Sequence, residues 1–264
     1  MKKKLLVFFA FGFFALFSVY KPVLADYSQA YNNYQYQYNL YRQDYENFTI
    51  AKATYLTYQT LTTQNDLLEK MRTVLLSRNR VMISYLATLS QKAMIADGLA
   101  PNDLATTQRI IGEETTFLSS LQNQISAAAT ISDLNTINTT FADHYQQLDT
   151  EAKQIVGQIL LGKTDYEDSK FADLTARSKL QVQRLSNLGE DTQSLSRGIT
   201  AAESKAALYD DKRSAAVEVL YPKNNFNFQK IDLLAGQKLI LDGRQYLHEA
   251  GSFLLEILNQ ITNG

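Results

Sequence analysis

The sequence predicts an all-α protein: an elongated antiparallel helical bundle or coiled coil of about five helices, with no β-sheet. Apolar residues recur at heptad spacing along most of the chain, as in helices that pack against other helices. Only three of the 264 residues are proline and eleven are glycine, and these mostly stand where helices should end. No stretch reads convincingly as a strand.

The N-terminal residues 1–25 are predicted to be an export signal. Three lysines follow Met1, an apolar run rich in phenylalanine comes next, and Val23-Leu24-Ala25 has the small-residue pattern of a cleavage site. The alternative is an uncleaved N-terminal anchor, but the apolar run is short for a membrane span. No other segment approaches the length of a span. We therefore expect an exported bacterial protein that is periplasmic, at the cell surface or extracellular.

Composition excludes several kinds of chemistry. The chain has no cysteine, which rules out disulfides, thiolate nucleophiles and cysteine metal sites. Its formal charge is −1, and loss of the four lysines of residues 1–25, where no acid occurs, leaves −5. A mildly acidic chain without basic blocks argues against nucleic acid as a partner.

The most informative pattern is a series of aromatic residues spaced alternately by four and three. A 3.5-residue repeat keeps one stripe of a helix facing a partner helix, so we interpret the series as a seam within the chain or between chains. The alternative is a row of exposed rings that binds other molecules. Tyr36 and Tyr58 lie off the main register and are the candidates for surface contacts. The aromatic seam comprises Tyr27, Tyr31, Tyr34, Tyr38, Tyr41, Tyr45 and Phe48.

The expected helices follow in order. The first covers about 27–96, and polar residues at 62–66 make that segment the expected place for a break. A turn at 97–103 leads to a helix that ends near residue 129, and Thr130 can cap the next one. Gly162 is expected to end that helix.

The remaining expected helices make up the C-terminal part of the chain. Thr164 and Glu167 form a predicted capping box for a helix that extends to about residue 220, although Gly189 and Gly198 interrupt its pattern. After a turn at 221–225, a last helix runs nearly to the C-terminus.

Helix lengths suggest one elongated domain over residues 26–264. Its four-helix part would lie around 60–185, and its three-helix part would combine 27–60 with 185–264. In that arrangement, the tyrosine rings would pack against small residues of the late helices, which would fill space without overpacking. These small residues include Ala202, Ala206, Gly236 and Gly243.

No motif predicts a catalytic, cofactor or metal site. Residues 157–164 match G-x-x-x-x-G-K-T, but no strand precedes them, so we interpret them as a helix end followed by a cap. His248-Glu249 lacks the second histidine of a zinc-protease helix. His144 is read as a hydrogen-bonded core residue.

The carboxylates have an equally ordinary interpretation. Asp165, Glu167 and Asp168 are expected at a helix N-terminus, where the helix dipole favours negative charge. Glu113-Glu114 and residues 210–213 are expected on solvated faces.

These observations predict a non-enzymatic helical-bundle protein with a structural or protein-interaction role in the cell envelope or outside the cell. Its partner would be another protein or a second copy, bound through helical seams. The alternative is a ligand-binding or sensor-like module with a site between helices near His144 and Tyr145. A membrane-active helical protein is a weaker alternative.

Overall fold

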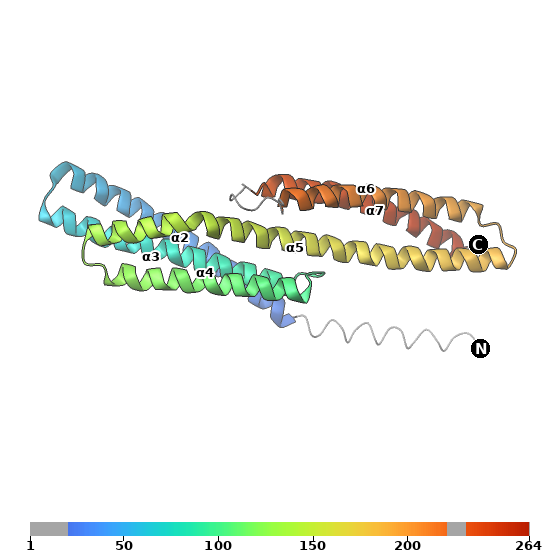
Figure 1. Ribbon diagram of the computed structural model, residues 1–264, viewed down its shortest axis with the longest axis horizontal. Helices are drawn as coiled ribbons and strands as arrows, with labels where there is room; N and C mark the ends of the chain where they lie inside the picture. Colours follow the sequence, from blue (N-terminus) through green and yellow to red (C-terminus); the bar gives the residue numbers. More distant parts are fainter. Residues whose placement is uncertain (1–20, 221–230, 264) are drawn as a thin grey trace. The chain divides into compact units, whose positions relative to one another are not determined.

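The computed structural model describes residues 21–220 and 231–263 and confirms the all-α prediction, with six helices and no strand in those ranges (Figure 1). Most of the predicted export signal and the predicted turn at 221–225 lie outside the described residues. The chain divides into two compact units. Unit 1 contains described residues up to 95 together with 104–148, and unit 2 contains 96–103 together with residues from 149 onward.

Unit 1 begins with a helical hairpin. Helix α2 (Lys21–Tyr58) ends at Gln59, whose φ of 48° lies in the left-handed region. Thr60 then caps α3 (Leu61–Met94): its hydroxyl accepts from the Thr63 backbone N–H at 3.2 Å, and its own N–H donates to the Thr63 hydroxyl at 3.1 Å. The predicted first helix is therefore two helices, and the break falls just before the expected 62–66.

Two further helical segments complete unit 1. Helix α4 (Pro101–Ala127) is followed by the predicted cap at Thr130, whose hydroxyl accepts from the Asp133 N–H at 3.1 Å and opens α5 (Ile131–Asn187). Large side chains are fully buried on three helices, and each contributes about 1.5–3 kcal/mol by its removal from water. They include Leu86, Leu118, Leu121, Ile125 and Leu134.

Helix α5 continues through Gly162, so the predicted helix end there is wrong. Gly162 instead allows a close approach of the backbone at residues 98–99, since a Cβ on Gly162 would lie 3.0 Å from the Leu99 nitrogen. The Thr164 hydroxyl donates within the helix to the Leu161 carbonyl at 2.7 Å rather than capping a new one. Tertiary contact therefore explains a glycine that the sequence suggested was a C-cap.

Gly189 ends α5 with a φ of +86°. The Glu190 N–H donates to the Leu185 carbonyl at 3.1 Å, and the Gly189 N–H donates to the Ser186 carbonyl at 3.0 Å, which is the Schellman pattern. Helix α6 (Gln193–Leu220) follows. After the interval that is not described, Asp232 caps α7 (Leu233–Asn263), accepting from the Ala235 N–H at 3.0 Å.

Unit 2 has its core between α6, α7 and the second part of α5. Helices α6 and α7 run side by side (Figure 1). Ala202 packs in one buried cluster with Leu254 and Ile257, and Ala216 packs in another with Ile240. Small residues of α6 are thus covered by large ones of α7.

The predicted grouping of residues 27–60 with 185–264 is corrected by this division. Residues 27–60 belong to unit 1, where α2 packs on α3, whereas 185–264 belong to unit 2. The physical reason is the turn at Gln59 and Thr60, which brings α2 back onto α3. The small residues expected to receive the tyrosine rings of 27–60 lie against side chains of α6 instead: Gly236 against Leu220, and Gly243 against Tyr209.

Replacing Gly112 with alanine is expected to raise the free energy of unfolding by about 0.5–1 kcal/mol, because alanine is the better helix former. Gly112 is an exposed residue inside α4, and a Cβ there would meet nothing within 4 Å. Urea-induced unfolding followed by circular dichroism measures the change. A lower stability would show that the glycine has a role that its surroundings do not reveal.

Candidate interaction surface

Alternate members of the predicted aromatic seam face α3. The Tyr34 ring lies 5.5 Å from the Tyr85 ring, and the Lys92 ammonium lies 5.1 Å from the centre of the Tyr27 ring. A step of seven residues along α2 therefore matches a step of seven in the opposite direction along α3. Burial raises the pKa of the Tyr34 hydroxyl, and Tyr38 and Tyr31 add to the effect. Tyr27, Tyr34, Tyr41 and Phe48 are all half-buried on this side.

The other tyrosines of the seam remain exposed. Tyr31, Tyr38 and Tyr45 are 41%, 45% and 53% exposed, and we call these three residues the exposed tyrosine row. Their rings adjoin the half-buried ones: the Tyr31 and Tyr27 centroids are 6.3 Å apart, and those of Tyr45 and Tyr41 are 6.1 Å apart. One side of the aromatic stripe thus packs on α3 while the other side faces solvent.

The stretch of α2 that carries the exposed tyrosines Tyr31 and Tyr38 has no charged residue. Residues 27–41 consist of tyrosine, asparagine, glutamine, serine, alanine and leucine, and the first charged residue after them is Arg42. Side-chain amides therefore surround the exposed rings. The face offers apolar area, phenol hydroxyls and amides, with no net charge to attract or repel a partner over that length.

Tyr36 and Tyr58, the predicted surface contacts, are 60% and 67% exposed. Tyr36 lies two residues before Tyr38, which places it about 160° away around the helix. Tyr58 is the last residue of α2, beside the turn. Neither belongs to the exposed tyrosine row, and their role in binding stays a prediction.

His144 is hydrogen-bonded in the interior of unit 1. Its Nε2–H donates to the Glu114 carboxylate, with distances of 2.9 and 2.8 Å to the two oxygens. The His144 ring also stacks 3.9 Å from Phe117. Glu114 is only 3% exposed, so its prediction as part of a solvated face is wrong, while neighbouring Glu113 pairs with Arg109 at the surface. Position 114 lies between the apolar Ile111 and Leu118 at helical spacing, a signal that marked it as inward-facing.

A half-buried charge of unit 1, Arg78, was not singled out by the sequence. Its Nη1 donates to the side-chain oxygen Oδ1 of Asn138 at 2.6 Å, and its guanidinium lies 3.6 Å from the centre of the Phe141 ring. Burial lowers the pKa of Arg78 to about 10, and Tyr41 partly offsets the effect. An aromatic face and an amide thus stabilise this cation in the unit 1 core.

The acids around residue 165 pair across helices. Because α5 continues through this region, they do not lie at a helix N-terminus as predicted. Asp165 accepts from the Arg213 side chain of α6, and Glu167 accepts from Arg244 of α7 at 2.7 and 2.8 Å. Arg213 is therefore not part of a purely solvated face. These interhelical pairs orient the helices of unit 2.

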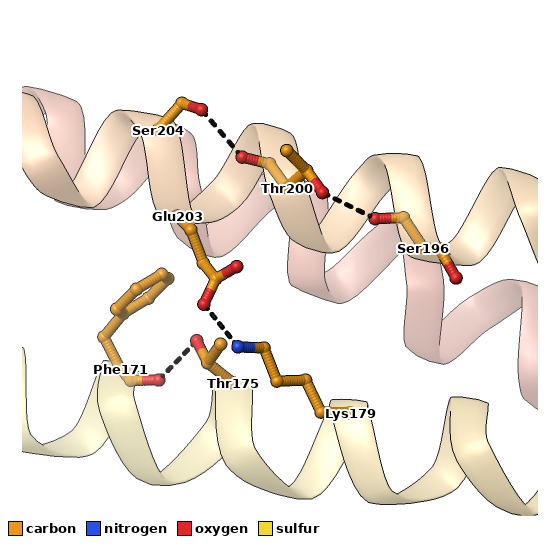
Figure 2. A network of polar contacts seen from close by, with 7 residues as sticks. All are labelled: Phe171, Thr175, Lys179, Ser196, Thr200, Glu203 and Ser204. Carbon is orange, nitrogen blue, oxygen red and sulfur yellow. Dashed lines mark hydrogen bonds and ion pairs between the residues drawn. The ribbon is translucent and has the colours of Figure 1, made fainter.

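Figure 2 shows a further link between α5 and α6. The Lys179 ammonium donates to the Glu203 carboxylate at 2.6 Å. On each helix, nearby hydroxyls donate to carbonyls one turn back, as Thr175 does to Phe171. Both charged side chains are about half exposed, so the pair is expected to contribute at most about 1 kcal/mol.

A groove of about 540 Å³ lies between α5 and α7. Phe171, Leu174 and Leu241 line it together with the Glu167–Arg244 pair. Its shape is shallow and solvent-facing. Among the described residues, no group of three or more histidines and acids is arranged to hold a metal ion.

Comparison of the chain with protein-family models, curated proteins and solved structures finds no match. Of the helices that the structure describes, none has a stretch long and apolar enough to cross a membrane.

Proposed function

We propose that this protein is an exported, non-enzymatic bacterial helical-bundle protein that binds a protein partner through the exposed tyrosine row. Its role would be structural or interactive, in the cell envelope or outside the cell. One observation carries the proposal: three tyrosines in one register stay 41–53% exposed while the intervening members of the same stripe pack on α3.

The chemistry of the row favours protein recognition. A tyrosine ring supplies a large rigid contact area at a low cost in side-chain entropy, and tyrosine is enriched among residues that dominate binding energy. Each ring of the exposed tyrosine row lies next to the ring of a half-buried tyrosine on the same helix. Less freedom is therefore lost on binding than for an isolated surface ring.

Export is supported by the sequence of residues 1–25, where a lysine-rich start precedes an apolar run and a small-residue cleavage pattern. The non-enzymatic part of the proposal is supported by what the titratable groups contact. His144 is engaged with Glu114, and Asp165 and Glu167 are engaged with arginines. Packing and orientation account for these contacts without a reaction.

The second candidate is a ligand-binding module. The predicted location near His144 is less favourable because the Nε2 of that histidine already bonds Glu114. The groove between α5 and α7 is the better location, since it combines apolar side chains with a charged pair. This function predicts a ligand-dependent rise in melting temperature. An unchanged melting temperature across a broad metabolite panel would count against it.

A photo-crosslinking amino acid placed at Tyr31, Tyr38 or Tyr45 tests the proposed function in the source cell. We expect protein adducts from each of these positions, because all three lie within one interface. The matched control is the same substitution at Tyr36, on another face of α2 and at least as exposed. Equal adduct yields at Tyr36 and in the row, or no adducts from the row, would overturn the proposal.

A further inference from the structure

We infer that the exposed tyrosine row binds a second copy of this chain, with the two α2 helices antiparallel and Tyr38 on the two-fold axis. This inference rests on the proposed function and specifies its partner. It follows from the spacing of the row, from the charges beside it and from the exposed area of its rings.

The spacing is symmetric about Tyr38. Tyr31 and Tyr45 each lie seven residues from it, which corresponds to about 10.5 Å along the helix in either direction. An antiparallel pair therefore sets Tyr38 against Tyr38 and Tyr31 of each copy against Tyr45 of the other. Such a self-complementary patch is what a two-fold interface requires.

Charge selects the antiparallel orientation. One turn beyond the rings, Gln35 follows Tyr31 and Arg42 follows Tyr38, while Lys52 continues the register of the row beyond Tyr45. A parallel pair would place Arg42 against Arg42 and Lys52 against Lys52, which is unfavourable. An antiparallel pair places Arg42 of each copy beside the neutral Gln35 of the other, where the guanidinium can donate to the amide oxygen.

The face disfavours strongly charged partners. Residues 27–41 have no charged side chain, and the charges of the four charged residues that follow them along the row sum to zero: Arg42, Asp44, Glu46 and Lys52. A neutral aromatic and amide surface is best matched by another of the same kind. The second copy supplies that surface without any further molecule.

The exposed ring area predicts a weak pair. Burying the exposed fractions of six tyrosines, at about 150–250 Å² for each whole side chain, removes roughly 400–700 Å² from water. A standard stable interface buries about 1,200–2,000 Å² in total. Even with the flanking amides, association is therefore expected to be reversible and concentration-dependent.

Single cysteines test the inference directly, because the chain has none of its own. The purified protein carrying Tyr38→Cys is expected to form a disulfide-linked dimer on mild oxidation, since the two-fold axis brings the two Cβ atoms together. The control is Tyr36→Cys, on another face of α2, which is expected to stay largely monomeric. Thermal unfolding of each variant verifies that it is folded.

Orientation is tested by mixing two variants. Tyr31→Cys and Tyr45→Cys should link to each other in the mixture much more than either links to itself. A parallel pair would instead link each variant to itself. Preferential self-linking, or a Tyr38→Cys yield no higher than that of Tyr36→Cys, would overturn the inference.

Self-pairing can fail while binding of a different protein through the exposed tyrosine row still holds. Photo-adducts from the row to a different protein, with no adduct between copies, would support the function and overturn self-pairing. Because cysteine removes a ring, the concentration dependence of the molar mass of the unaltered chain is the second measurement. A mass that stays monomeric at every concentration would also overturn self-pairing.

Discussion

Replacing His144 with alanine is expected to lower the free energy of unfolding by roughly 3 kcal/mol, because it removes the imidazole that donates to the buried Glu114 carboxylate. The Glu114 side chain is 4% exposed and accepts from His144 at 2.8 Å, so water cannot readily take the place of the imidazole. The stacking of His144 on Phe117 is lost as well. Urea-induced unfolding followed by circular dichroism measures the change.

The control for this prediction is His144→Gln, since a glutamine amide can still donate to the carboxylate. It should cost clearly less than the alanine variant. The double variant Glu114→Leu with His144→Leu should also be more stable than His144→Leu alone, because the buried charge is removed together with the imidazole. Equal losses in alanine and glutamine variants would mean that Glu114 does not depend on His144.

Replacing Gly98 with alanine is expected to destabilise unit 2 by roughly 3 kcal/mol, through backbone strain together with steric overlap. Gly98 has a φ of +78°, and a Cβ there would lie 2.0 Å from the Gly162 carbonyl oxygen. The connection between α3 and α4, residues 96–100, would have to move away from α5 to relieve the contact. Loss of stability in urea is again the measurement.

Gly189→Ala is the matched control for the Gly98 variant. Gly189 also has a positive φ, of +86°, but a Cβ there would meet nothing within 4 Å. It therefore reports the strain alone, which is about 1 kcal/mol. If the two variants lost the same stability, the close approach of residue 98 to α5 would be contradicted.

The fold class could be predicted because heptad spacing is a local property of the sequence. The cap at Thr130 was predictable for the same reason, since its partner Asp133 is three residues away. The break near Thr60 was misplaced by only a few residues. Several threonines and other polar residues stand there in succession, and only the geometry shows that Thr60 is the cap.

Features that depend on contacts distant in the sequence could not be predicted. The sequence around Gly162 resembles that of a helix end, but glycine is needed there because the backbone at residues 98–99 lies too close for a side chain. Asp165 stands in a sequence that resembles a helix start, but its side chain forms an ion pair with Arg213, 48 residues later. The sequence shows the residue type at positions 162 and 165, but it does not show which distant part of the chain lies against that residue.

One property of the aromatic stripe could be predicted from local sequence, and another depends on contacts distant in the sequence. Its 3.5-residue repeat correctly indicates a face of one helix, but the repeat does not state how much of that face a partner covers. Helix α3 covers the side that holds Tyr34, where burial raises the pKa of the hydroxyl, and leaves the side that holds Tyr38 exposed. That incomplete coverage is the basis of the function that we propose.

The most direct test of this account is the molar mass of the purified protein in solution, measured by light scattering over a range of concentrations. We expect the mass to rise from that of one chain toward that of two, and Tyr38→Arg to abolish the rise by placing two like charges on the axis. Tyr36→Arg should leave the rise unchanged. A constant monomer mass, or the same rise in the Tyr38→Arg variant, would contradict pairing through the exposed tyrosine row.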